Sequence, residues 1–175
     1  MTEKKELILE TALKLFAEQG FDTTPTSKIA RLAGVSEGLI FRHFGTKEGL
    51  MKAVVELGES RIGRHLTGIE QEGNHRQRIH KIIELAYVLF QEEREFWQLQ
   101  FTIKWQRKYT HAHTSPHYLR LMQLGMESFR ALGYAEPEKE IQLLAMLVEG
   151  FGSMMIKQPD AATLENMLTF IKSKY

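Results

Sequence analysis

Basic side chains gather in one short stretch of this 175-residue chain, between positions 26 and 47. The stretch contains Lys28, Arg31, Arg42, His43 and Lys47, and its one acidic residue is Glu37. Ammonium and guanidinium groups at this density can bind the phosphates of a nucleic acid, because they neutralise phosphate charge and release counterions. The whole chain has a net charge of only +1, so a nucleic-acid surface on it is expected to be local.

Two short helices with a tight bend between them are predicted to position these side chains. The first helix has Thr26 as a good N-cap, and Gly34 is suited to end it because glycine enters the left-handed region at little cost. Ser36 is a good N-cap for the second helix, since its hydroxyl can accept the backbone N–H of Leu39. The residues that face inward from the first helix are Ile29, Ala30 and Ala33.

The two helices are predicted to cross closely as a helix-turn-helix. In the second helix Ile40 and Phe44 share one face and can fill the angle between the helices, whereas Glu37 and Phe41 share another face. A helix-turn-helix places its second helix in the major groove of DNA. The candidates for base or sugar contact are Glu37, Gly38, Leu39 and Phe41. The candidates for phosphate contact are Ser27, Lys28, His43 and Lys47, and Thr26 and Ser36 at the helix starts complete the predicted DNA-binding set.

Residues 7 to 54 carry the skeleton IA–AGVS–G–IF–HF–KE–L and resemble the DNA-binding domain of the tetracycline-repressor (TetR) family of bacterial transcription regulators. The resemblance implies an all-α fold. An N-terminal three-helix helix-turn-helix domain (residues 1–48, with a linker helix from about residue 46) would precede a helical ligand-binding and dimerisation domain (residues 49–175). It also implies that Lys47 contacts phosphate and that the protein represses transcription. The family usually has tyrosine at the position of Phe41, so one hydroxyl-to-phosphate bond is absent here.

Departures from the family pattern leave an alternative function open. Phe41 and the acidic Glu37 are also compatible with a dimeric helical ligand sensor or scaffold whose N-terminal module has lost specific DNA binding. Salt-dependent binding to a palindromic operator would distinguish the two functions.

Aromatic and methionine residues in the second half of the chain are candidates for the wall of a ligand pocket, since such pockets are mostly apolar. These residues are Trp97, Phe101, Trp105, Met122, Met126 and Phe129. The alternative is that each belongs to the ordinary hydrophobic core. A ligand bound there is expected to be small and largely apolar.

The last two predicted helices, one from Pro137 to before Pro159 and one from Asp160 to Lys172, have apolar faces so broad that they need a partner. A four-helix bundle with the same pair of a second subunit would cover them. The predicted interface residues are Ile141, Leu144, Val148, Gly152, Met155, Leu164, Leu168 and Ile171. A two-fold homodimer would read a palindrome, and a ligand that changed the spacing of the reading helices would release the DNA.

Composition argues against several other classes of protein. The chain has no cysteine, which excludes disulfides, thiolate catalysis and zinc-finger sites. Nor does it contain a G-x-S-x-G, P-loop or H-E-x-x-H motif, so we expect neither an enzyme nor a cofactor. His111, His113 and His117 have the spacing of a metal site, but a solvated loop is the preferred interpretation and no metal is expected. Without an apolar leader or a run long enough to cross a bilayer, the protein is expected in the cytoplasm, away from membranes.

Overall fold

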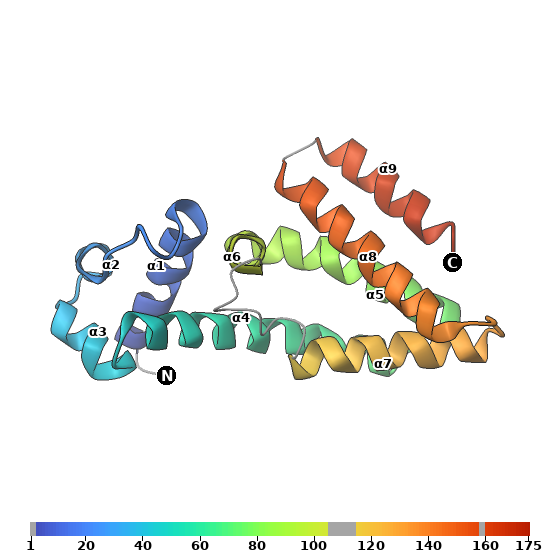
Figure 1. Ribbon diagram of the computed structural model, residues 1–175, viewed down its shortest axis with the longest axis horizontal. Helices are drawn as coiled ribbons and strands as arrows, with labels where there is room; N and C mark the ends of the chain where they lie inside the picture. The colour runs from blue at the N-terminus through green and yellow to red at the C-terminus, as the bar shows by residue number, and fades with distance from the viewer. Residues whose placement is uncertain (1–2, 105–114, 158–159) are drawn as a thin grey trace. The chain divides into compact units, whose positions relative to one another are not determined.

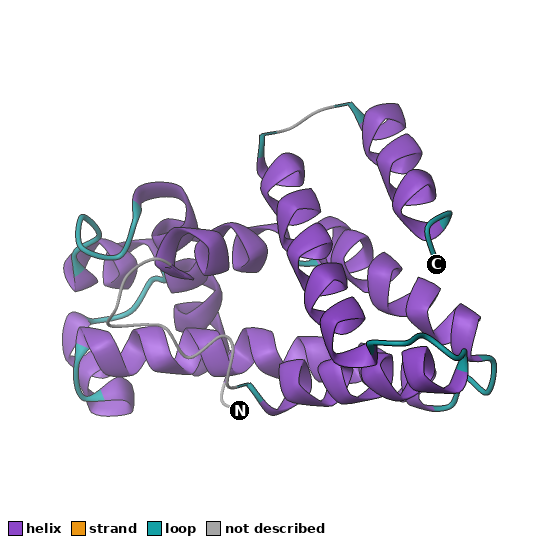
Figure 2. Cartoon of the chain, turned by 45° about the vertical axis from the view of Figure 1, so that its right-hand side comes forward, coloured by secondary structure: helices purple, strands orange, loops and turns teal. Residues whose placement is uncertain are grey.

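The computed structural model describes residues 3–104, 115–157 and 160–175, with the backbone alone for residues 61–62 and 100–104. All regular structure in these residues is helical (Figures 1 and 2), so the predicted all-α fold class is confirmed. The helices are α1 (Glu3–Gln19), α2 (Thr26–Leu32), α3 (Glu37–Phe44), α4 (Lys47–Glu70), α5 (His75–Glu92), α6 (Arg94–Lys104), α7 (Pro116–Ala131), α8 (Pro137–Ile156) and α9 (Ala161–Lys172).

The described residues form two compact units. One contains the chain up to Arg61 together with α6, and the other contains residues 62–92 with α7, α8 and α9. The boundary between the units therefore falls inside α4. The predicted division into a DNA-binding domain (residues 1–48) and a ligand-binding and dimerisation domain (residues 49–175) stays a prediction.

In the core of the first unit α1 packs against α6 and also against α2 of the helix-turn-helix. Ile8 and Phe16 of α1 are fully buried, and Phe96 of α6 is almost fully buried. Gly58 of α4 is required for this packing, because a Cβ there would lie 1.8 Å from the Phe96 ring. The large ring thus fills the space that a side chain on α4 would otherwise occupy. The remaining fully buried large residues of this unit are Ile29, Ile40, Leu50, Met51 and Leu99.

In the second unit α5 packs against α7, α8 and α9. Phe129 of α7 is completely buried, and its ring centroid lies 5.0 Å from that of Tyr134 and 5.4 Å from that of Tyr175. Edge-to-face aromatic pairs of this kind add to the stability that burial itself provides. Phe129 is therefore a core residue, which is the alternative that the sequence had left open for it.

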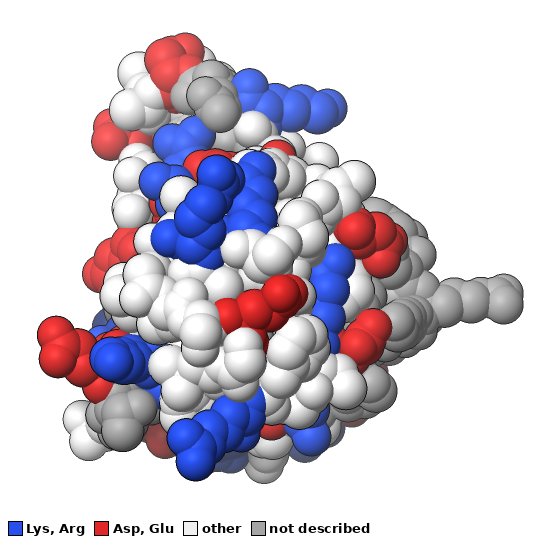
Figure 3. All heavy atoms as spheres, turned by 90° about the vertical axis from the view of Figure 1, so that its left-hand side faces the viewer, with Lys and Arg blue, Asp and Glu red and all other residues white. Residues whose placement is uncertain are grey.

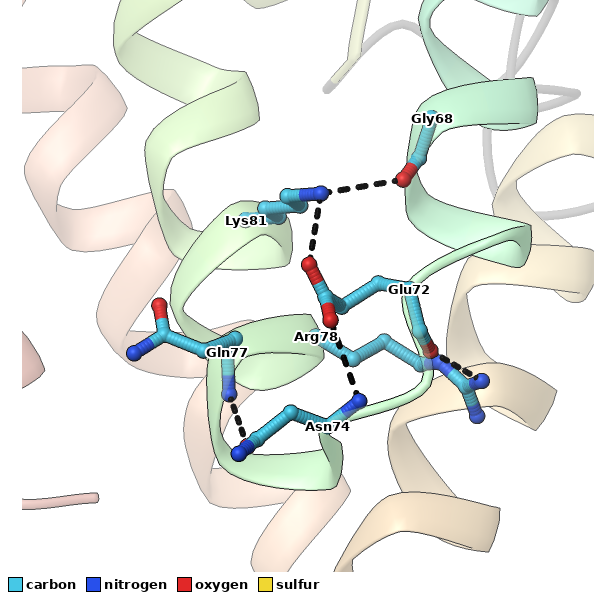
Figure 4. A network of polar contacts seen from close by, with 6 residues as sticks. All are labelled: Gly68, Glu72, Asn74, Gln77, Arg78 and Lys81. Atoms are coloured by element: carbon cyan, nitrogen blue, oxygen red, sulfur yellow. Dashed lines mark hydrogen bonds and ion pairs between the residues drawn. The ribbon is translucent and has the colours of Figure 1, made fainter.

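Polar contacts fix the turn between α4 and α5 in the same unit (Figure 4). The Glu72 carboxylate accepts hydrogen bonds from Lys81 Nζ at 2.7 Å and from the Asn74 backbone N–H at 3.0 Å. Lys81 Nζ also donates to the Gly68 carbonyl at 3.3 Å. The hydrogen bond with Lys81 and the backbone bond from Asn74 lower the pKa of the Glu72 carboxyl. The α4–α5 junction is thus held by charge-assisted bonds rather than by a tight turn alone.

The predicted dimer face on α8 and α9 requires correction. Both helices lie side by side (Figures 1 and 2), but most of the predicted interface residues are buried inside the protomer. The buried ones are Ile141, Leu144, Gly152, Met155, Leu164 and Ile171, and only Val148 and Leu168 are half-buried. Packing against α5 and α7 has used this face, so it is not available to a second subunit.

Candidate nucleic-acid interface

The bend between α2 and α3 has the local geometry that the sequence predicts. Gly34 has a φ of +64°, and the Val35 backbone N–H donates to the Ala30 carbonyl at 3.0 Å. Ser36 has extended backbone angles, and its hydroxyl oxygen accepts the Leu39 backbone N–H at 3.3 Å. The predicted positive φ of Gly34 and the predicted capping role of Ser36 are therefore confirmed.

Helix α3 is amphipathic, and only one of its sides is packed. Helices α2 and α3 pack together, and Ile29 of α2 and Ile40 of α3 are both fully buried. The next residue of α3, Phe41, is 44% exposed. Leu39 and Phe44 are half-buried. The residues of α3 that are exposed to solvent are Glu37, Gly38, Phe41, Arg42 and His43. The structure thus leaves on one short helix a surface that combines a carboxylate, an aromatic ring and two basic side chains.

The start of α2 differs in detail from the prediction. Pro25, not Thr26, occupies the N-cap position, and it makes no side-chain cap bond. Thr26 is the first residue of the helix, and its hydroxyl donates to the Glu37 carboxylate at 2.5 Å. The Thr26 side chain therefore connects the beginnings of α2 and α3.

Both of the predicted phosphate-binding lysines are held by neutral acceptors. Lys28 Nζ donates to the Gln19 side-chain carbonyl oxygen at 2.6 Å. Lys47 Nζ donates to the Asp22 backbone carbonyl at 3.4 Å and lies 4.4 Å from the centroid of the Phe21 ring. Because these partners carry no full negative charge, the contacts place the ammonium groups without neutralising them.

Gly49 is a residue that the sequence reasoning missed. The Thr46 hydroxyl caps α4 by accepting the Gly49 backbone N–H at 3.0 Å. A Cβ on Gly49 would lie 2.0 Å from the Phe44 carbonyl oxygen. Glycine therefore lets the first turn of α4 approach the end of α3. A glycine in the first turn of a helix, where a good helix former is expected, is the signal that could have revealed this contact.

Figure 3 views the molecule from the side on which α2 and α3 lie in Figure 1. Lys and Arg side chains form separate groups on this face, with Asp and Glu between them and uncharged surface around them (Figure 3). The surface is therefore not a continuous basic patch. Any affinity of this face for DNA must come from a few placed cations and from direct contacts with the bases.

The predicted ligand-site residues fall in different parts of the structure. Trp97 is half-buried on α6 in the first unit, whereas Met122 and Met126 are half-buried on α7 in the second. The Phe101 side chain and the whole of Trp105 lie outside the described residues, as do His111 and His113. His117 packs its ring near Gly63, where a Cβ would lie 2.9 Å from it. Within the described ranges, no three histidine, aspartate or glutamate side chains are grouped so that they could hold a metal ion.

The length and polarity of the helices decide whether any of them could span a membrane. Among the described residues, every helix is either too short or too polar to cross a bilayer.

The fold and the exposed side of α3 define a helix-turn-helix protein. Comparison with known proteins is more specific, because residues 8–54 match the family described as "Bacterial regulatory proteins, tetR family". The uncharacterized HTH-type transcriptional regulator YuxN of Bacillus subtilis is 31% identical over 101 residues, which make up 57% of this chain and 35% of that protein. The chain thus spans about a third of the length of the curated relatives that it matches.

Two solved structures share the fold over nearly the whole chain. One is a transcriptional regulator from Saccharomonospora viridis in complex with choline, with a TM-score of 0.81, 20% identity, and coverage of 99% of this chain and 95% of that one. The other is AibR in complex with isovaleryl coenzyme A and operator DNA, with a TM-score of 0.75, 16% identity, and coverage of 98% and 97%. Residues 8–54 of the chain thus match the tetR family of bacterial regulatory proteins, and the fold of the whole chain is shared with solved regulators. Its relatives are regulators, so the prediction that it is not an enzyme is confirmed.

Proposed function

We propose that this protein is a transcriptional repressor that binds a palindromic operator as a homodimer. The observation that carries the proposal is the orientation of α3, which buries Ile40 and leaves Glu37 and Phe41 exposed on the same side. Side chains on one exposed face of a short helix can enter the major groove together. Lys28 and Lys47, held by neutral partners on the same module, are suited to bind the flanking phosphates.

Exposed apolar residues on α8 and α9 support the homodimer. Met146 is 67% exposed and Phe170 is 57% exposed, which is unusual for side chains of this size and polarity. The other large exposed apolar residues of these two helices are Leu143, Leu147 and Met167. We assign the dimer interface to this face in place of the buried residues predicted from the sequence. A second subunit that covers it would form a four-helix bundle about a two-fold axis.

A small, largely apolar ligand bound in the helical C-terminal part is proposed to release the operator. Two structural neighbours were solved as complexes with small molecules, one with choline and the other with isovaleryl coenzyme A and operator DNA. In this chain, Met122 and Met126 of α7 are only half-buried and offer apolar surface for such a ligand. A ligand releases DNA only if it favours the conformation that binds DNA poorly.

Titration of duplex DNA from the promoter region of the protein's own gene, followed by fluorescence anisotropy at several salt concentrations, tests DNA binding. Lys47→Ala should weaken binding to all sequences and reduce the salt slope by about 1, because one phosphate contact is lost. Phe41→Ala should instead change the preference between operators, because its ring lies on the reading face. The exposed Lys157 provides the control, and Lys157→Ala should bind as the wild type does.

Two outcomes would contradict the proposal in different ways. Weak binding without sequence preference by an intact dimer would favour the alternative function, a helical ligand sensor that has lost specific DNA binding. Wild-type affinity in both Lys47→Ala and Phe41→Ala would show that the assigned surface is wrong. Repression itself is tested by in vitro transcription, in which added protein should lower the yield of the promoter that carries the operator.

A further inference from the structure

The hydrogen bond between Thr26 and Glu37 connects residues eleven positions apart at the starts of α2 and α3. The Thr26 hydroxyl has one hydrogen, and it is donated to one oxygen of the Glu37 carboxylate at 2.5 Å. Thr26 is half-buried, whereas Glu37 is exposed. The bond therefore fixes the direction of a carboxylate that would otherwise move freely in solvent.

We propose that Glu37 reads a cytosine in the operator and that Thr26 is the positioning residue that aims it. The inference rests on the proposed DNA-binding function and adds the identity of one base. A carboxylate can only accept hydrogen bonds. Thr26 occupies one of the Glu37 oxygens, and the second oxygen remains able to accept a hydrogen bond from a base edge.

The chemistry of the major groove selects cytosine among the four bases. Cytosine presents its N4 amino group as a donor, whereas guanine presents the acceptors N7 and O6 and thymine presents the acceptor O4. Adenine has a donor at N6, but its N7 acceptor lies beside it and would repel the carboxylate. Glu37 thus gains a hydrogen bond at cytosine and faces a repulsive acceptor at each of the other bases.

The surroundings of Glu37 agree with this role. It is in the first turn of α3, where the helix dipole stabilises a negative side chain. Phe41 follows four residues later and is exposed on the same side of the helix. Because its ring has no hydrogen-bonding atom, Phe41 does not compete for the amino group, and it can pack on a neighbouring thymine methyl instead.

Selection of bound duplexes from a library with randomised half-sites, followed by sequencing, tests the inference. The wild type should select a cytosine at one fixed position of each half-site. Glu37→Gln should move the preference at that position from cytosine to adenine by about tenfold or more, because an amide can bond N6 and N7 together. The preferences at all other positions should stay unchanged.

Two variants of Thr26 separate positioning from folding. Thr26→Val removes the hydroxyl at nearly constant shape and should flatten the cytosine preference at that same position. Thr26→Ser retains the hydroxyl and should keep the preference. Thermal unfolding of both variants checks that the domain is intact. A merely structural role for Thr26 would lower affinity at every operator equally and would leave the base preference as it is.

Failure of the inference can be told apart from failure of the proposed function. If the wild type selects defined operators but Glu37→Gln selects the same base at every position, Glu37 does not read cytosine, and the DNA-binding function stands. An unchanged preference in Thr26→Val would overturn the positioning role. If the wild type selects no sequence at all, the proposed function fails, and the inference fails with it.

Discussion

The helix-turn-helix and the α8–α9 pair differ in how well the sequence pattern predicts which of their residues are exposed. In α3 the predicted inner residue Ile40 is buried and the predicted outer residue Phe41 is exposed. In α8 the predicted outer residue Leu144 is only 1% exposed, while Met146 is 67% exposed. Both regions consist of amphipathic helices, yet only the first presents the face that its sequence pattern indicates. The difference shows that a helix can be predicted correctly while its orientation is not.

The composition of the two helices explains this difference. Helix α3 has two large apolar residues, Leu39 and Phe41, besides Ile40 and Phe44, and its polar residues Glu37, Arg42 and His43 mark the outer side. Helix α8 is apolar on nearly all sides, since Ile141, Leu144 and Met155 are buried while Leu143 and Met146 are exposed. Periodicity alone cannot choose between two apolar faces. The partners of the helix make that choice.

The largest expected effect concerns the core of the helix-turn-helix. Ile40→Ala should lower the free energy of unfolding by about 2–5 kcal/mol, because it leaves a cavity in a fully buried site. The matched control is the adjacent Phe41→Ala, which should change stability by less than about 1 kcal/mol because its ring is already partly in solvent. Urea denaturation followed by circular dichroism measures both. A larger loss in Phe41→Ala than in Ile40→Ala would mean that α3 has the opposite orientation.

The next effect concerns the exposed face of α8 and α9. Met146→Glu combined with Phe170→Glu should raise the dimer dissociation constant about a hundredfold or more, because each charge would be buried without a partner. Analytical ultracentrifugation measures the dissociation constant. The protomer should remain folded, since both residues are exposed within it.

The control for this face is Leu144→Ala. It should cost the protomer about 2–5 kcal/mol of stability and should not act specifically on association. A double variant that dimerised as the wild type does would place the interface elsewhere.

A smaller effect is expected at the contact between α3 and α4. Gly49→Ala should destabilise the first unit by roughly 1–3 kcal/mol, because its Cβ would meet the Phe44 carbonyl oxygen and the backbone must shift. Gly38→Ala is the control, since no atom lies within 4 Å of a Cβ built there. In that variant the better helix propensity of alanine should raise stability by up to about 1 kcal/mol. Thermal unfolding should therefore shift in opposite directions, and a shift in the same direction would contradict the close approach.

The smallest effect is a pH dependence in the second unit. Burial lowers the pKa of the His80 imidazole, and the positive charges of Lys172 and Arg76 lower it further, against the opposing effects of Glu84 and a backbone hydrogen bond with Lys172. His80 Nε2 is also buried without a hydrogen-bond partner. Below pH ~6.5 the unfolded chain therefore binds more protons at His80 than the folded chain does. The stability that the neutral His80 contributes to the fold is present above pH ~6.5 and decreases as the pH falls towards the folded pKa.

His80→Gln removes the titrating group and should therefore lose less stability than the wild type between pH 7.5 and 5.5. Urea denaturation at the two pH values measures the difference. A variant that lost as much stability as the wild type over this range would show that His80 titrates alike in the folded and unfolded states.

The sequence by itself determined the features that depend on neighbouring residues. The positive φ of Gly34 and the Ser36 cap each depend on a backbone angle or a hydrogen bond within about one helical turn. Such interactions are set by residue type, whatever the rest of the chain does. The helix-turn-helix could therefore be predicted together with its exposed residues.

Only the tertiary structure decided the features that depend on distant segments. It placed Phe129 in the core, turned Leu144 inward, and joined Thr26 to Glu37. It also explains why glycine is needed at positions 58 and 49, because the Phe96 ring lies against Gly58 and the end of α3 lies against Gly49. Packing between helices is set by shape and by the total apolar area that is buried, and neither quantity is encoded in a local pattern of residues.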